Sequence, residues 1–150
     1  YYTGPEEFVL FTHFGLGLVS DKMDLCISLG FPEGDGDTFY GMDLEFVLGS
    51  YPDTSISIGG HRQGDTKGAD VTLLLSGNMD SVFPYIGLDL KYEFADPEDF
   101  YYMNAILGSE FRFKPDIGFI IEGGFELVNS VDETVDFDSS YISLGLVIYF

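Results

Sequence analysis

Apolar and polar residues alternate with a period of two along most of this chain, which is the pattern of a half-buried β-strand rather than of an amphipathic helix. The clearest example is the segment 22–31, where apolar residues occupy every second position: Met23, Leu25, Ile27, Leu29 and Phe31. The pattern recurs in 38–51, 82–94, 117–127 and 142–150, and more weakly in 7–19, 55–62, 70–78 and 101–113. The sequence therefore predicts an all-β fold with about nine strand candidates and no helix.

The connections between these segments alternate in length. We expect short turns at 20–22, 52–53, 79–81 and 114–116, and longer acidic or glycine-rich loops at 33–37, 63–68, 95–99 and 129–140. Short and long connections that alternate are typical of an antiparallel up-and-down meander with two different ends. No linker or repeat divides the 150 residues, so we expect a single domain over residues 1–150.

Composition indicates which face of the strands meets water. The chain is 45% hydrophobic and 17% aromatic, and large apolar residues from every strand would overfill the interior of a small soluble barrel. Apolar residues that face lipid meet no such limit, and glycines at the polar positions leave room for larger neighbours inside. Tyr and Phe are concentrated near strand ends, as in the aromatic belts that transmembrane proteins carry at the membrane–water interface. We therefore expect an antiparallel up-and-down transmembrane β-barrel.

The sequence leaves two possible numbers of strands, eight and ten. Bacterial single-chain barrels have an even number of strands, and the polar segment 55–62 is the weakest candidate, so eight strands are favoured. Ten strands are the alternative, if a further strand precedes the segment 7–19. The first residue is Tyr1 rather than Met, and we expect a processed chain or a longer precursor. No apolar run reaches the roughly 18 residues of a membrane-spanning helix.

The C-terminal sequence YISLGLVIYF ends in an aromatic residue preceded by apolar residues at alternate positions, namely Ile142, Leu144, Leu146, Ile148 and Phe150. This ending resembles the last strand of bacterial outer-membrane β-barrel proteins, and the meander is similar to small OmpA/OmpX/OmpW-like barrels. The resemblance implies that these residues are the signal read by the barrel-assembly machinery. It also implies that a lipid bilayer, or detergent in its place, surrounds the protein in the outer membrane of a Gram-negative bacterium.

With the apolar faces outward, charged residues of the opposite faces would line the lumen or pore. These are Asp24, Asp43, Glu45, Asp89, Lys91, Glu93, Glu110, Arg112, Glu122 and Glu126, with Lys22 as a further base. Acids outnumber bases there, and carboxylates in a narrow interior need partners, protonation or water. Two interpretations stay open: a charge-paired plug in a structural or adhesive barrel, and a narrow pore that prefers cations.

The chain carries 6 Lys and Arg against 26 Asp and Glu, a net charge of −20. Nucleic acid is therefore not an expected partner, because phosphate binding needs a clustered basic face. The acidic loops would attract divalent cations. The run EGDGD at 33–37 lacks the terminal bidentate Glu of a full calcium loop, which indicates a solvated turn.

Catalytic and cofactor chemistry find little support in the sequence. His13 and His61 are the only histidines, and neither has the Ser and acid neighbours of a catalytic triad. A zinc site would need more His or Cys than the chain has, and Cys26 is interpreted as a small filler on the inner face. We expect no enzyme activity, cofactor or metal. The alternative function is a soluble lipocalin-like barrel that binds a hydrophobic ligand, with a lipid-processing membrane enzyme ranked last.

Overall fold

The computed structural model describes residues 9–19, 22–32, 37–50, 53–94, 99–114, 117–130 and 141–148. They form an antiparallel meander in which each strand pairs with its neighbours in sequence. The strands are β1 (Val9–Val19), β2 (Met23–Pro32), β3 (Phe39–Ser50), β4 (Asp53–Gln63), β5 (Thr66–Ser76), β6 (Val82–Phe94), β7 (Phe100–Lys114), β8 (Ile117–Asn129) and β9 (Tyr141–Ile148). Within these ranges no helix is long and apolar enough to cross a membrane.

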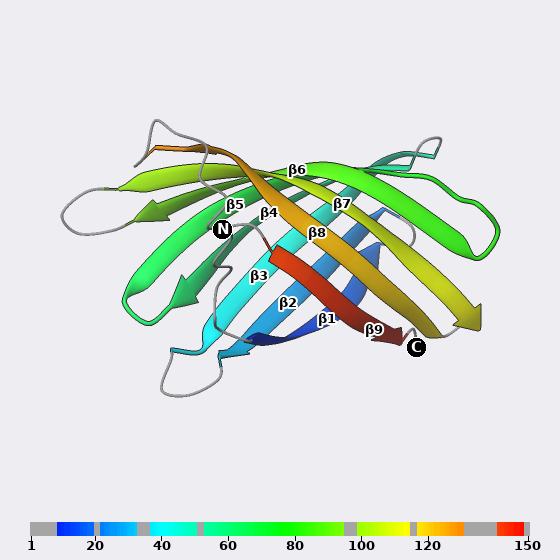
Figure 1. Ribbon diagram of the computed structural model, residues 1–150, viewed down its shortest axis with the longest axis horizontal. Coiled ribbons are helices and arrows are strands. Elements are labelled where there is room, and N and C mark those ends of the chain that lie inside the picture. The colour runs from blue at the N-terminus through cyan, green and yellow to red at the C-terminus, as the bar shows by residue number, and fades with distance from the viewer. Residues whose placement is uncertain are drawn as a thin grey trace, which may run out of the picture.

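The sheet curls into a half-barrel (Figure 1), in which β7–β9 slope in the opposite direction to β2–β4. Strong curvature of a sheet brings together inward side chains from strands that are not direct neighbours. Tyr85 on β6 reaches Glu122 on β8, and His61 on β4 reaches Glu93 on β6. The described residues show no pairing between β1 and β9.

The all-β class and the meander order are confirmed, but the favoured count of eight strands is wrong for the described residues, which form nine. The segment thought weakest is β4, which pairs along one edge with β3 and along the other with β5. Its inward positions include the small residues Ser57 and Gly59 as well as His61, while Ile58 is 52% exposed on the outer face. The apolar signal of β4 is weak because Gly60 and Arg62 interrupt the outward series that follows Ile56 and Ile58.

The prediction of a long loop at 63–68 is also wrong. Gln63 pairs with Thr66, so β4 and β5 are joined by a two-residue turn at Gly64 and Asp65. Gly64 has a φ of 59°, and type II′ hairpins require a positive φ at this first central position. The end of the sheet that carries this turn and the connections 33–38, 95–99 and 130–140 is called the loop end below, and the opposite end the turn end.

The two faces of the sheet differ sharply in chemistry. On β6, the outward Ile86, Leu88 and Leu90 are each at least 44% exposed, whereas the inward Asp89 and Glu93 are 7% and 6% exposed. Among the described residues, the buried side chains include one hydrophobic residue, Ile106, and a larger polar set: Ser28, Asp89, Glu93, Asn104, Glu110 and Glu126. This distribution is the inverse of a soluble core, in which apolar residues fill the interior.

Candidate functional site

The inward positions of the strands form a continuous polar face on the concave side. The charged residues that the alternation assigned to one face do alternate with exposed apolar residues of the same strands and lie on this side. They are Asp24, Asp43, Glu45, Asp89, Lys91, Glu93, Glu110, Arg112, Glu122 and Glu126. Lys22 was expected with them, but it lies in the turn before β2 and is exposed.

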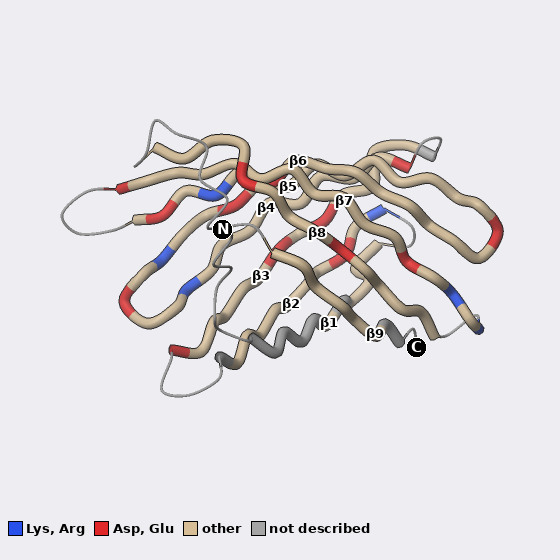
Figure 2. The backbone as a smooth tube through the Cα atoms, viewed as in Figure 1, with Lys and Arg blue, Asp and Glu red and all other residues tan. Residues whose placement is uncertain are grey.

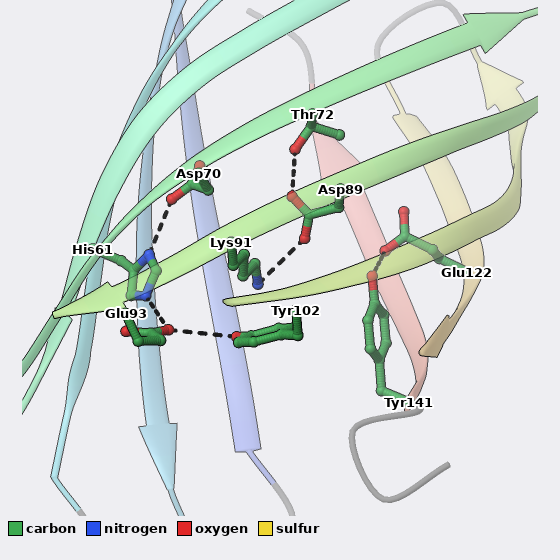
Figure 3. Close-up of polar contacts among 9 residues, drawn as sticks. All are labelled: His61, Asp70, Thr72, Asp89, Lys91, Glu93, Tyr102, Glu122 and Tyr141. Atoms are coloured by element: carbon green, nitrogen blue, oxygen red, sulfur yellow. Dashed lines mark hydrogen bonds and ion pairs between the residues drawn. The ribbon is translucent and has the colours of Figure 1, made fainter. Parts of the chain in front are cut away.

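His61 is the centre of a cluster near the loop end (Figure 3). Its Nδ1 lies 3.0 Å from Asp70 Oδ1, and its Nε2 lies 2.7 Å from Glu93 Oε1. An imidazole donates from both nitrogens only when it is protonated, so this geometry matches a positively charged ring held between two carboxylates. The ring also stacks on Phe39, with 5.5 Å between centroids.

Lys91 lies between this cluster and the middle of the sheet. Its Nζ is 3.5 Å from Asp89 Oδ2 and 5.9 Å from the centroid of the Tyr102 ring. The other carboxylate oxygen of Asp89 accepts a hydrogen bond of 2.8 Å from the Thr72 hydroxyl. Asp89 thus receives both a cation and a neutral donor, which offsets the cost of burying its charge.

Among the described residues, Glu122 has no cationic partner and is held by hydroxyl groups. Tyr85 on β6 and Tyr141 on β9 each donate a hydroxyl hydrogen bond of 2.8 Å to one of its two carboxylate oxygens. Nearer the turn end, Arg112 Nε donates to Glu110 Oε1 at 2.7 Å, and its guanidinium stacks over Phe83 at 4.1 Å. Glu110 is therefore partnered by a cation, and Glu122 by two tyrosine hydroxyls.

Glycines make these cross-strand contacts geometrically feasible. A Cβ added at Gly68 would collide with the His61 ring, and one added at Gly108 or Gly124 would collide with the ring of Tyr85 or Tyr141. Each large side chain lies over a glycine of the next strand; His61 and Tyr85 reach a carboxylate on the strand beyond it, and Tyr141 reaches Glu122 on the same strand as the glycine. The sequence expectation that inward glycines make room for larger neighbours is confirmed at Gly108 and Gly124.

A cavity of about 400 Å³ opens at the loop end, with His61, Lys91, Glu93, Phe39 and Tyr102 among its lining residues. In the described part of the chain, no group of three or more His, Cys, Asp and Glu is arranged to hold a metal ion. Around His61 the reason is visible, since the two carboxylates lie on opposite edges of the ring and do not converge with it on one point.

Sequence reasoning missed several members of the network. From the sequence, His61 is considered only as a catalytic candidate, and Asp70, Tyr85, Tyr102 and Tyr141 are not among the predicted site residues. A signal for His61 was present, because it alternates with Ser57 and Gly59 and so belongs to the inward face. The hydrogen bonds depend on cross-strand register, which alternation within one strand does not reveal.

Two further sequence predictions fall wholly or partly outside the described residues. Of the proposed assembly signal, Ile142, Leu144 and Leu146 face outward on β9 and are at least 67% exposed, while Phe150 and the side chain of Ile148 lie outside. Most of the acidic loop residues also lie outside. Asp99 is described, and it accepts a hydrogen bond of 3.0 Å from the Tyr92 hydroxyl.

No family model, curated protein or solved structure matches this chain.

Proposed function

We propose that the chain is a small outer-membrane β-barrel of a Gram-negative bacterium, with an acidic interior that favours cations over anions. The observation that carries this proposal is the inverted burial: the buried side chains are mostly polar and include Asp89, Glu93, Glu110 and Glu126, whereas large apolar side chains are exposed on the opposite face of the sheet. Soluble monomers rarely expose apolar patches larger than a few hundred Å². Lipid is the environment in which such a surface is stable, provided that strand closure satisfies the backbone.

The distribution of exposed aromatic residues supports the same proposal. Tyr40, Tyr92, Phe94 and Tyr101 are exposed near the loop end, and Phe113 is exposed near the turn end, with mostly Leu, Ile and Val, and also Phe125, between them. Transmembrane barrels carry an apolar band flanked by aromatic girdles at both interfaces. The short turns would then face the periplasm and the longer connections the exterior.

The interior supports a water-filled, cation-preferring path. His61, Lys91 and Arg112 balance a part of the inward carboxylates, which leaves an acidic excess that would attract cations and repel anions. His61, Tyr85 and Tyr141 each pass close over a glycine, which leaves more of the interior free than a side chain at that position would. A cavity at the loop end, lined by Glu93 and Lys91, would form the entrance.

A second candidate is a structural or adhesive barrel with a sealed interior. It is favoured by the internal partners of the inward charges, such as the pair Arg112–Glu110 and the tyrosine hydroxyls on Glu122. A lipocalin-like carrier is less well supported, because such a protein would bind a hydrophobic ligand with apolar residues on its concave side. The concave side here presents carboxylates.

Detergent dependence tests the membrane assignment. Protein refolded in micelles is expected to keep its β-structure by circular dichroism and to resist unfolding by cold dodecyl sulfate. It should aggregate when the detergent is removed. A folded, monodisperse monomer in detergent-free buffer would contradict the proposal.

Planar-bilayer recording tests the pore. We expect small conductances and a reversal potential that reports cation preference in a salt gradient. The double substitution Glu122→Gln and Glu126→Gln should reduce that preference, because it removes two inward charges. The matched control, Asp65→Asn with Asp80→Asn, neutralises two exposed turn residues and should leave the reversal potential almost unchanged. No conductance would favour the sealed barrel, and anion preference would contradict the acidic path.

A further inference from the structure

The six Lys and Arg residues of this chain are distributed unevenly over the sheet. Lys91 and Arg112 face inward and are paired with Asp89 and Glu110. Lys22 and Lys114 lie at the turn end. The remaining two, Arg62 and Lys67, are directly paired across β4 and β5 beside the hairpin turn at the loop end. Figure 2 shows these two basic segments side by side next to the acidic turn.

Arg62 and Lys67 belong to a row of outward positions that crosses neighbouring strands. Tyr40 on β3 is the partner of Arg62, and Phe94 on β6 is the partner of Lys67. Both aromatic residues are exposed, by 56% and 53%. The row therefore reads aromatic, Arg, Lys, aromatic.

This row lies at the border of the apolar band. Toward the middle of the sheet, one outward step at Gly60 and Ala69 separates the two cations from the exposed Ile58 and Val71. Outward positions along a strand are roughly 7 Å apart. In the proposed membrane orientation the two cations would thus lie at the level of the lipid headgroups.

The two cations have no acidic partner among the described residues, within the distance that defines an ion pair, in contrast to Lys91 and Arg112. Arg62 Nε donates a hydrogen bond of 2.9 Å to the carbonyl oxygen of Gly64, which fixes one edge of the guanidinium group. A hollow of about 470 Å³ opens beside it, with Thr38, Tyr40 and Asp37 in its lining. The terminal nitrogens of Arg62 are therefore accessible to a ligand from outside.

We propose that Arg62 and Lys67, flanked by Tyr40 and Phe94, bind the phosphate group of an anionic membrane lipid at the loop end. This inference rests on the proposed membrane function. A guanidinium matches two phosphate oxygens with parallel hydrogen bonds, a lysine adds a point charge, and aromatic rings prefer the interface. The strongly acidic remainder of the protein repels anionic lipids, so the attraction is confined to this site.

The negative charge of Asp37 should repel a phosphate group bound at this site. Its carboxylate lies close to Gly64, at the edge of the same hollow. Removal of this charge should therefore strengthen binding, which is an outcome opposite in sign to the loss of the cations.

The test is native mass spectrometry of the folded full chain in a neutral detergent, titrated with short-chain phosphatidylglycerol or, for comparison, phosphatidylcholine. The wild type is expected to retain phosphatidylglycerol preferentially. Arg62→Gln with Lys67→Gln should weaken its binding roughly thirtyfold, since each of the two basic residues near a membrane contributes about 1 kcal/mol toward anionic lipid. Asp37→Asn should strengthen binding several-fold.

The control is Lys22→Gln with Lys114→Gln, which removes the same charge at the turn end. An equal loss of lipid in this control would show non-specific attraction and overturn the site. Competition by millimolar inorganic phosphate as effective as that by the lipid would also overturn it, because the ligand would then be free phosphate. A wild type that folds and inserts into vesicles without preferring the anionic lipid refutes this site alone. A wild type that stays soluble and never inserts refutes the proposed function.

Discussion

The outer and inner faces of the β5–β6 hairpin follow different rules. On the outer face, Leu73 and Leu88 are cross-strand partners that remain 40% and 44% exposed. On the inner face of the same strands, Thr72 donates a hydrogen bond to Asp89, and Leu74 packs directly over Gly87. The outer face requires little beyond apolarity, whereas the inner face depends on the size and polarity of individual neighbours.

The strongest test of this comparison uses two adjacent leucines that point to opposite faces. If the outer face contacts lipid, Leu73→Arg places a charge in the apolar band and should destabilise the fold by about 2–4 kcal/mol. Leu74→Arg faces the polar interior and should cost clearly less. Urea titration of vesicle-inserted protein, followed by the gel mobility of the folded form, measures both.

Leu73→Ile keeps the outer position apolar and should unfold at the wild-type urea concentration. The informative comparison is between Leu73→Arg and this control. In water, an arginine at a 40%-exposed position would be nearly neutral. Equal midpoints for the two variants would therefore mean that the outer face is not in lipid.

Inward glycines provide the next test, because they differ in the space beside them. A Cβ at Gly124 would overlap the Tyr141 ring, whereas the nearest atom to a Cβ at Gly145 is Ile120 Cβ at 3.8 Å. Gly124→Ala should cost about 2 kcal/mol by overpacking. Gly145→Ala, on the same face of the next strand, should be neutral or slightly stabilising. Similar urea midpoints for both variants would show that the aromatic rings do not depend on glycine.

Much of this fold can be predicted from the sequence, because a period of two along a strand fixes which residues share a face. This holds for the inward carboxylates from Asp24 to Glu126. The predictions failed where local chemistry overrides the period. β4 is polar on one side and glycine-rich near its end, and the turn at Gly64 and Asp65 resembles a longer loop because Thr66 and Lys67 continue the strand as polar residues.

The partners of the inward residues were not predictable in the same way. Glu122 meets Tyr85 and Tyr141, which are 37 and 19 residues away in sequence. Which residues lie opposite each other depends on turn lengths and on bulges such as those of β7 against β8. A single strand shows that a side chain points inward, but the pairing of several strands determines what it contacts.

The smallest expected effect concerns the two tyrosines that hold Glu122. Tyr85→Phe or Tyr141→Phe removes one hydroxyl donor and should each cost about 1 kcal/mol, because the carboxylate keeps its other donor. The double variant should cost more than the sum, since Glu122 then loses both hydroxyl partners. Tyr101→Phe, an outward tyrosine that is 44% exposed, serves as the control and should leave the midpoint unchanged. Strict additivity in this double-mutant cycle would mean that water replaces the tyrosine hydroxyls freely, as in a wide and hydrated interior rather than in a tightly interlocked one.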